Sequence, residues 1–152
     1  MIEVNSELIE HMASPKNYGP LKDYDAMGIG ENPQNGEKVI VYIKVDESSG
    51  VPKIVDIGFE AIACMTTVVA GSIITNEARG VDFEMANELI STTLGMLDTI
   101  PPEDAACSEM VALAIKAAVD TYVKRQDDAT YPAITYQIAN SCVPKEEQEG
   151  EK

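Results

Sequence analysis

The chain has 152 residues, a mass of 16.4 kDa and a formal net charge of −15. A protein this acidic is repelled by the phosphates of nucleic acids and by anionic membrane surfaces, so neither is expected as a partner. No apolar run approaches the roughly 20 residues of a transmembrane helix, and the first residues lack the basic and apolar regions of a signal peptide. Three cysteines, an odd number, argue against a secreted disulfide framework. The sequence therefore predicts a cytoplasmic protein with its own hydrophobic core.

The first 36 residues predict one short helix followed by irregular chain. Helical spacing favours a helix over Asn5–Met12, which must end before Pro15 because proline disfavours helical geometry in the residue that precedes it. Residues 16–36 are rich in glycine, proline and asparagine, which is typical of extended or looping chain. Gly28 and Gly30 follow no predicted strand and open no predicted helix, so they do not indicate a phosphate-binding loop.

An antiparallel β-hairpin is predicted in the next part of the chain. Apolar and polar residues alternate over Val39–Val45, with the period of two that is typical of a half-buried strand. Asp46–Gly50 supplies turn residues, and Ile54–Glu60 returns as the second strand. The residues expected on one face of this second strand are Val55, Ile57 and Phe59.

Three helices are predicted after the hairpin. Residues 65–80 are β-branched, but their helical spacing and the Arg79–Gly80 ending favour a helix over a strand. Asp82 is expected to cap the second helix, and Ser108–Lys124 is expected to form the third and longest. The expected core faces are Met65, Val69, Ser72, Ile73 and Asn76 in the first helix, Phe83, Ala86, Leu89 and Ile90 in the second, and Val111, Ala114, Ile115, Ala118, Val119 and Tyr122 in the third.

Two of the three cysteines lie just before predicted helices. Cys64 precedes the first of these helices and Cys107 the third. Thr66 and Thr67 follow Cys64, and Ser108 follows Cys107, and both residue types cap helix N-termini. Because a helix N-terminus favours negative charge, such a cysteine gains thiolate character, which makes it a better nucleophile and a better metal ligand. Cys142 lies near an acidic C-terminal segment with no helper residue beside it, so it is interpreted as having no role in a site, the alternative being that it serves as a replacement thiolate ligand.

Four stretches of the sequence together resemble a known family. They are SPKNYG, NGEKVIVYIKV, ACMTTVVAGSIITNEARG and IPPEDAACSEMVALAIKAAVDTY. The resemblance, over about Glu7–Lys124, is to the U-type iron–sulfur cluster assembly scaffolds, the IscU, SufU and NifU N-terminal group. It implies an α+β fold in which a small antiparallel sheet of about three strands carries helices on one face. The scaffold domain is expected to span 1–127, followed by a C-terminal extension at 128–152. This extension would hold an edge strand through Ile134, Tyr136 and Ile138, then a disordered acidic tail.

The resemblance also implies a ligand set, of which this chain keeps a part. Where the family has a Cys-Gly-Asp stretch, this chain reads Asn35-Gly36-Glu37, and where the family has His-Cys-Ser it reads Ala106-Cys107-Ser108. One cysteine and the histidine are therefore missing, and Glu37, Cys64 and Cys107 remain as the expected metal ligands. Restoring the set with Asn35→Cys and Ala106→His is expected to leave stability nearly unchanged.

The implied function is that of a scaffold or carrier, not an enzyme. It would bind a [2Fe–2S] cluster, or an iron or zinc ion, and transfer it to apo iron–sulfur proteins. A cysteine desulfurase would deliver persulfide sulfur, with Cys107 as the acceptor. A [2Fe–2S] cluster generally takes four protein ligands, so two chains meeting as a homodimer would supply four thiolates, Cys64 and Cys107 from each. Two alternatives remain open: a degenerate scaffold that regulates a cysteine desulfurase, and a thiol redox protein in which Cys64 and Cys107 form a reversible disulfide.

Overall fold

The computed structural model describes residues 15–34, 36–63, 65–99 and 102–138. The predicted helix Asn5–Met12, Asn35, Cys64 and Cys142 lie outside these ranges. Within the described residues, no helix combines the length and hydropathy needed to cross a membrane.

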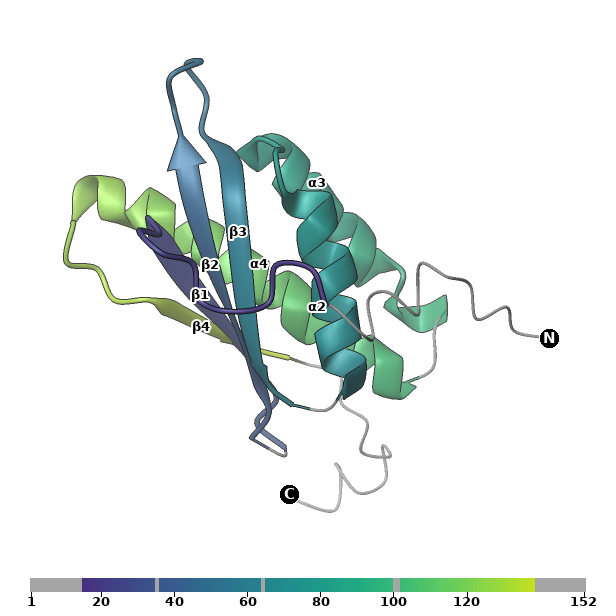
Figure 1. The fold of residues 1–152 in the computed structure, drawn as a ribbon. Helices are drawn as coiled ribbons and strands as arrows, with labels where there is room; N and C mark the ends of the chain where they lie inside the picture. The colour runs from purple at the N-terminus through teal and green to yellow at the C-terminus, as the bar shows by residue number, and fades with distance from the viewer. Residues whose placement is uncertain (1–14, 35, 64, 100–101, 139–152) are drawn as a thin grey trace.

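A four-stranded sheet carries the helices on one face (Figure 1). The strands are β1 (Ala26–Glu31), β2 (Lys38–Asp46), β3 (Lys53–Ile62) and β4 (Ile134–Gln137), in the order β3-β2-β1-β4. The first three are antiparallel neighbours, whereas β4 lies parallel to β1. The helices are α2 (Met65–Ala78), α3 (Phe83–Gly95) and α4 (Pro102–Asp127), with a short 3-10 helix, η1 (Leu97–Thr99). The expected α+β class is confirmed, and β4 confirms the edge strand expected through Ile134 and Tyr136, but the sheet is mixed where an antiparallel one was expected.

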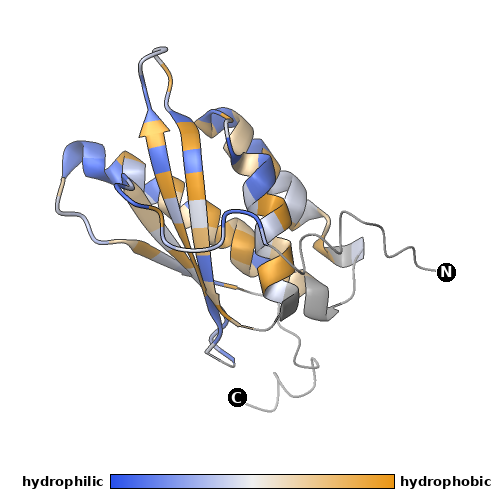
Figure 2. Ribbon diagram, viewed as in Figure 1, coloured by the Kyte–Doolittle hydropathy of each residue, from blue (hydrophilic) through white to orange (hydrophobic). Residues whose placement is uncertain are grey.

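The predicted hairpin is confirmed, with a change of register near its turn. β2 and β3 pair antiparallel throughout, and Figure 2 shows apolar and polar residues alternating along both. Lys44 pairs with Asp56 and Val45 with Ile54, so Val55 is an extra residue on β3, which is a β-bulge. The bulge reverses which face of the sheet successive side chains point to. The expectation that Val55 shares a face with Ile57 and Phe59 is therefore wrong, since Val55 is 39% exposed and the other two are buried.

β1 was not predicted, because its alternate positions carry Ala26, Gly28 and Gly30 instead of large apolar residues. These small residues let the backbone of α4 lie directly against the strand. A Cβ atom on Gly28 would lie 2.1 Å from the Ala118 amide nitrogen, and one on Gly30 would lie 2.1 Å from the Met110 carbonyl oxygen. Gly28 and Gly30, which the sequence analysis assigned to a loop, therefore belong to a strand that packs directly against the backbone of α4.

The three predicted helices are present, and two of their details differ from expectation. Asp82 caps α3 as predicted, since its Oδ1 accepts a hydrogen bond of 2.8 Å from the Met85 amide. α4 begins at Pro102, six residues before the predicted start, because proline suits the first turn of a helix. The inward face of α2 is small and polar, with Gly71, Ser72 and Thr75 buried there. The predicted core residues Ile73 and Asn76 are exposed instead.

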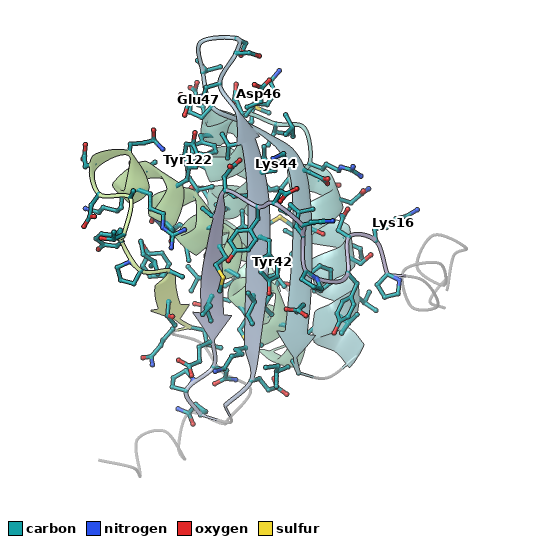
Figure 3. The ribbon with its side chains drawn as sticks, turned by 60° about the vertical axis from the view of Figure 1, so that its left-hand side comes forward. Lys16, Tyr42, Lys44, Asp46, Glu47 and Tyr122 are labelled. Atoms are coloured by element: carbon teal, nitrogen blue, oxygen red, sulfur yellow. The ribbon has the colours of Figure 1, made fainter. Side chains whose placement is uncertain are left out.

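Three tyrosines donate hydrogen bonds to carboxylates around the sheet. Tyr42 lies on the sheet face away from the helices (Figure 3) and its hydroxyl donates to Glu60 at 2.5 Å. The hydroxyl of Tyr122 donates to Glu47 of the β2–β3 turn. The hydroxyl of Tyr136 donates to Asp120 at 2.5 Å, which ties β4 to α4. The pKa of each of these three phenols is raised to about 12. For Tyr42 and Tyr122 the main cause is burial, followed by the hydrogen bond to the carboxylate. For Tyr136 the main cause is the hydrogen bond to Asp120, followed by burial.

These raised values predict a loss of stability in strong alkali. A phenol with a higher pKa in the folded chain than in the unfolded chain contributes stability that is complete below the unfolded value near 10. That stability is lost as the pH rises toward about 12. Absorbance titration of phenolate should show three of the six tyrosines ionising about two pH units later in the folded protein than in urea. Coincident folded and urea titrations would contradict these hydrogen bonds.

The close contact between β1 and α4 predicts that Gly30→Ala is strongly destabilising. The added Cβ would meet the Met110 carbonyl oxygen at 2.1 Å, so α4 must move away from the sheet. We expect the free energy of unfolding, measured in urea, to fall by at least about 1–3 kcal/mol. Gly95→Ala is the matched control, because nothing lies within 4 Å of its added Cβ, and its effect should stay within about 0.5 kcal/mol. Similar losses in the two variants would show that the contact is not tight.

Candidate functional site

Four chain segments meet at one end of the sheet, which we call the ligand edge. β1 ends at Glu31, which pairs with Lys38 at the start of β2, and Lys38 pairs with Ile62 at the end of β3. Gln137, the last residue of β4, pairs with Glu31 from the other side. The β1–β2 turn and the segment that leads from β3 toward α2 therefore leave the sheet at this edge, and β4 ends there (Figure 1).

The β1–β2 turn fixes the backbone of Glu37 at the ligand edge. Asn32 is 1% exposed, and its amide donates a hydrogen bond of 2.8 Å to the Glu37 carbonyl. Its side-chain oxygen accepts from the Gln34 amide at 2.9 Å, and its carbonyl accepts from the Gly36 amide at 2.9 Å. Gly36 has a φ of +79°, a conformation that glycine adopts without strain. The backbone of Glu37 is thus held by Asn32 where the chain enters β2, and Glu37 is half-buried.

α4 brings Cys107 to the same edge. The helix lies against Gly28 with Ala117 and Ala118, and against Gly30 with Met110, so it runs in the opposite direction to β1. Its first turns therefore lie where β1 ends. Cys107 precedes Met110 by one helical turn and is 5% exposed.

A direct contact joins Cys107 to α2. The hydroxyl Oγ1 of Thr67 donates a hydrogen bond to Cys107 Sγ at 3.0 Å. Thr67 lies in the first turn of α2 and is fully buried. Because Thr67 follows Cys64 by only three residues, this contact brings the two segments that carry the predicted thiol ligands against one another.

The electrostatic setting of Cys107 differs from the predicted one. The expectation that Cys107 lies at a helix N-terminus is wrong, because it is the sixth residue of α4, beyond the first turn where the dipole acts. Its sulfur instead contacts the first turn of α2.

Two of the three predicted ligands, Cys107 and Glu37, lie among the described residues, and both are near the ligand edge. Cys107 touches α2, and the backbone of Glu37 lies at the ligand edge, whereas Cys64 falls outside the described ranges. The chain's single histidine, His11, also falls outside them. Among residues 15–34, 36–63, 65–99 and 102–138, no three histidine, cysteine, aspartate or glutamate residues gather as a metal site. Close approach of Glu37, Cys64 and Cys107 remains a prediction.

Two residues near Cys107 were not singled out from the sequence. Thr67 was interpreted only as a residue type suited to helix caps, yet its hydroxyl contacts a sulfur from a helix 40 residues away in sequence. Glu109 is 6% exposed, although a glutamate two residues after Cys107 would ordinarily be assigned to solvent. No signal in the sequence identifies Thr67, because its partner is Cys107 and not the neighbouring Cys64.

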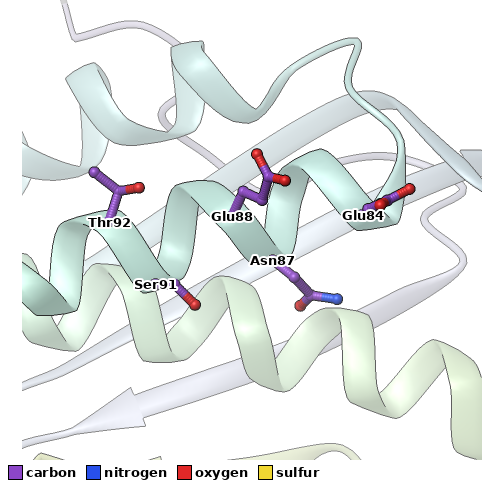
Figure 4. A pocket seen from close by; sticks show the side chains of 5 residues that line it. All are labelled: Glu84, Asn87, Glu88, Ser91 and Thr92. Atoms are coloured by element: carbon purple, nitrogen blue, oxygen red, sulfur yellow. The ribbon is translucent and has the colours of Figure 1, made fainter.

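A pocket on α3 is separate from the ligand edge. It is lined by Glu84, Asn87, Glu88, Ser91 and Thr92 (Figure 4). These residues supply carboxylates, an amide and hydroxyls but no thiolate, so the pocket lacks the ligands that soft metals and iron–sulfur clusters prefer.

Comparison with known proteins gives a consistent result. The model of the NifU-like N terminal domain family matches residues 3–129. A protein named iron-sulfur cluster assembly scaffold protein IscU 1, from Archaeoglobus fulgidus, is 27% identical over 122 residues, which cover 80% of this chain and 77% of that protein. A protein named iron-sulfur cluster assembly protein 1, from Oryza sativa subsp. japonica, is 31% identical over 121 residues, which cover 78% of this chain and 70% of that protein.

Solved structures share the fold at lower sequence identity. An iron-sulfur cluster assembly scaffold protein for the SUF system, from Fervidobacterium islandicum, superposes with a TM-score of 0.64 at 16% identity, covering 76% of this chain and 95% of that one. The N-terminal NifU-like protein from Brucella abortus gives 0.62 at 18% identity, with 80% and 94% coverage. Because the family model spans most of the chain and a relative at 31% identity is covered over more than two thirds of its length, this chain belongs to the family of NifU-like N-terminal domains.

Proposed function

We propose that this chain is an iron–sulfur cluster assembly scaffold that binds its cargo at the ligand edge and transfers it to apo-proteins. The cargo would be a [2Fe–2S] cluster, or a single iron or zinc ion. The observation that carries the proposal is the hydrogen bond from Thr67 to Cys107, which holds a buried sulfur against the helix turn that follows Cys64. The names of the relatives and the shared fold support the same function.

The ligand chemistry suits a soft metal with few protein donors per chain. Cys64 and Cys107 would bind as thiolates and Glu37 as a carboxylate, whereas the amide at Asn35 is a poor donor to iron or zinc. Two thiolates from one chain leave a [2Fe–2S] cluster half-ligated, because such a cluster generally takes four protein ligands. A homodimer formed through the ligand edge would supply Cys64 and Cys107 from each chain.

Burial of Cys107 has a consequence for delivery and release. At 5% exposure, the sulfur cannot be reached by a sulfur donor or an acceptor protein until neighbouring segments move aside. The same burial places the sulfur in a medium of low dielectric constant, where the hydrogen bond from Thr67 is stronger than it would be in water. We propose that a cysteine desulfurase supplies the sulfur and that apo iron–sulfur proteins receive the cluster.

The first test of this proposal is anaerobic reconstitution of cysteine variants with iron and sulfide. Wild type, Cys64→Ser, Cys107→Ser and Cys142→Ser would be compared by visible absorbance, sulfide content and molar mass. We expect wild type to hold its cluster as a dimer. Loss of Cys64 or Cys107 should abolish the bound cluster, since each chain then offers a single thiolate. Cys142→Ser is the matched control, because it removes a thiol that the proposed site does not use.

Three outcomes would change the assignment. A cluster bound equally well by all four proteins would show that the sulfur ligands lie elsewhere. A wild type that holds a full cluster as a monomer, lost in Cys142→Ser, would show that Cys142 replaces the missing thiolate. Absence of any cluster, together with a disulfide between Cys64 and Cys107 and a mass lower by two hydrogens, would favour the redox alternative.

Restoring the family ligands separately is the second test, and the structure corrects what we expect of one of them. Ala106 is 3% exposed within the hydrophobic core, so Ala106→His forces a larger, polar ring into packed space. We expect the free energy of unfolding to fall by about 1–3 kcal/mol, contrary to the nearly neutral effect predicted from sequence. Asn35→Cys adds a thiolate in the β1–β2 turn and should raise cluster affinity while lowering the fraction of dimer. Urea unfolding and molar mass of the reconstituted proteins measure the two effects.

A further inference from the structure

We propose that Thr67 is a positioning residue for the Cys107 ligand. Its hydroxyl donates a hydrogen bond to the sulfur, holds that sulfur toward the first turn of α2, and slows the loss of bound metal. This inference rests on the proposed function, because it concerns Cys107 as a ligand. It adds a residue outside the expected set of Glu37, Cys64 and Cys107.

The contact is enclosed and geometrically constrained. Thr67 is fully buried and Cys107 is 5% exposed, and their Oγ1 and Sγ atoms lie 3.0 Å apart. A hydroxyl withdrawn from water costs free energy unless it forms hydrogen bonds inside the protein, so its orientation is tied to the partners that it finds there. Threonine in a helix also has few χ1 rotamers, which limits the directions in which its hydroxyl can point. The direction toward Cys107 is therefore a property of the packed α2–α4 interface.

The chemistry of a bound thiolate assigns the donor. A sulfur that coordinates a metal has no proton of its own, so in the loaded state only the threonine hydroxyl can supply the hydrogen atom in this contact. Hydrogen bonds to ligating sulfur orient the ligand and withdraw electron density from it, and partners of this kind are among the factors that set metal affinity and potential. Low dielectric around the pair strengthens the effect.

A structural role would require only the shape of the side chain. If Thr67 merely filled space between α2 and α4, valine, which has nearly the same shape, would serve as well. The two roles are therefore separated by exchanging the hydroxyl and the methyl group independently. Thr67→Val removes the donor and keeps the shape, whereas Thr67→Ser keeps the donor and removes a methyl group.

The experiment uses Co²⁺ as the probe on the full chain, under anaerobic conditions. Sulfur-to-cobalt charge-transfer absorbance reports thiolate coordination, and competition with a chelator gives affinity and dissociation rate. We expect Thr67→Val to bind Co²⁺ about 10- to 100-fold more weakly, as is usual when a partner of a metal ligand is removed. Its charge-transfer band should shift to longer wavelength, because the sulfur becomes more electron-rich. Thr67→Ser should retain the wild-type band and most of the affinity.

The outcomes separate this inference from the proposed function. Wild-type affinity and an unshifted band in Thr67→Val would overturn the role of the hydroxyl while leaving the site intact, provided that Cys107→Ser weakens the band. Equal weakening in Thr67→Ser and Thr67→Val would also overturn it, since the methyl group would then be responsible. A wild type without charge-transfer absorbance, or a Cys107→Ser variant indistinguishable from it, would overturn the proposed function as well. Circular dichroism and urea unfolding of the metal-free variants show whether each is folded.

Discussion

The contact between two glycines of β1 and the backbone of α4 determines where the candidate site lies. With no Cβ atoms at Gly28 and Gly30, the helix axis can approach the strand closely enough for backbone atoms to touch it. The two points of contact fix both the direction of α4 and its position along the strand. α2 and α3 pack beside α4 on the same face, so their placement depends on the helix that these glycines admit. Cys107 reaches the ligand edge because α4 runs opposite to β1.

The Thr67–Cys107 contact joins α4, which packs against the sheet, to the N-terminal end of α2. Cys107 sits one turn from Met110 on a helix held against the sheet, and Thr67 sits in the first turn of a helix whose own inner face is lined with hydroxyls. The hydroxyl of Thr75 donates to the Gly71 carbonyl at 2.6 Å, and Ser72 accepts from the Lys16 amide at 2.6 Å. The polar groups on this helix face form hydrogen bonds both within the helix and with the chain that precedes β1, and the hydroxyl of Thr67 donates to a sulfur atom.

The features predicted well from the sequence were those that repeat along it. β2 and β3 alternate with a period of two, and α3 and α4 carry apolar stripes, so each pattern contained several residues that agreed. β1 was missed because its inward residues are Ala26, Gly28 and Gly30. Residues with small or absent side chains produce no alternation of apolar and polar residues in the sequence. The Val55 bulge was missed because a single inserted residue changes the register without changing the composition.

The candidate ligands Cys64, Cys107 and Glu37 could be selected from the sequence because they stand at motif positions of the family that the chain resembles. Thr67 could not, since its importance lies in a contact with a residue 40 positions away, and threonine after a cysteine has several ordinary explanations. The burial of Ala106 likewise depends on α4 starting at Pro102, which moves that alanine from an expected loop into the core.

The parallel pairing of β4 with β1 bears on how the chain reaches its native state. Glu31 and Gln137 are neighbours in the sheet although 106 positions separate them in the chain. Contacts of such long range form only after a large loop has closed, and they slow folding compared with local pairings. During synthesis, the β2–β3 hairpin and the first helices can form early, but the sheet gains its last strand only when nearly all of the domain has been made. Until β4 is added, β1 is an edge strand. Its unpaired backbone N–H and C=O groups can then form hydrogen bonds with another extended chain.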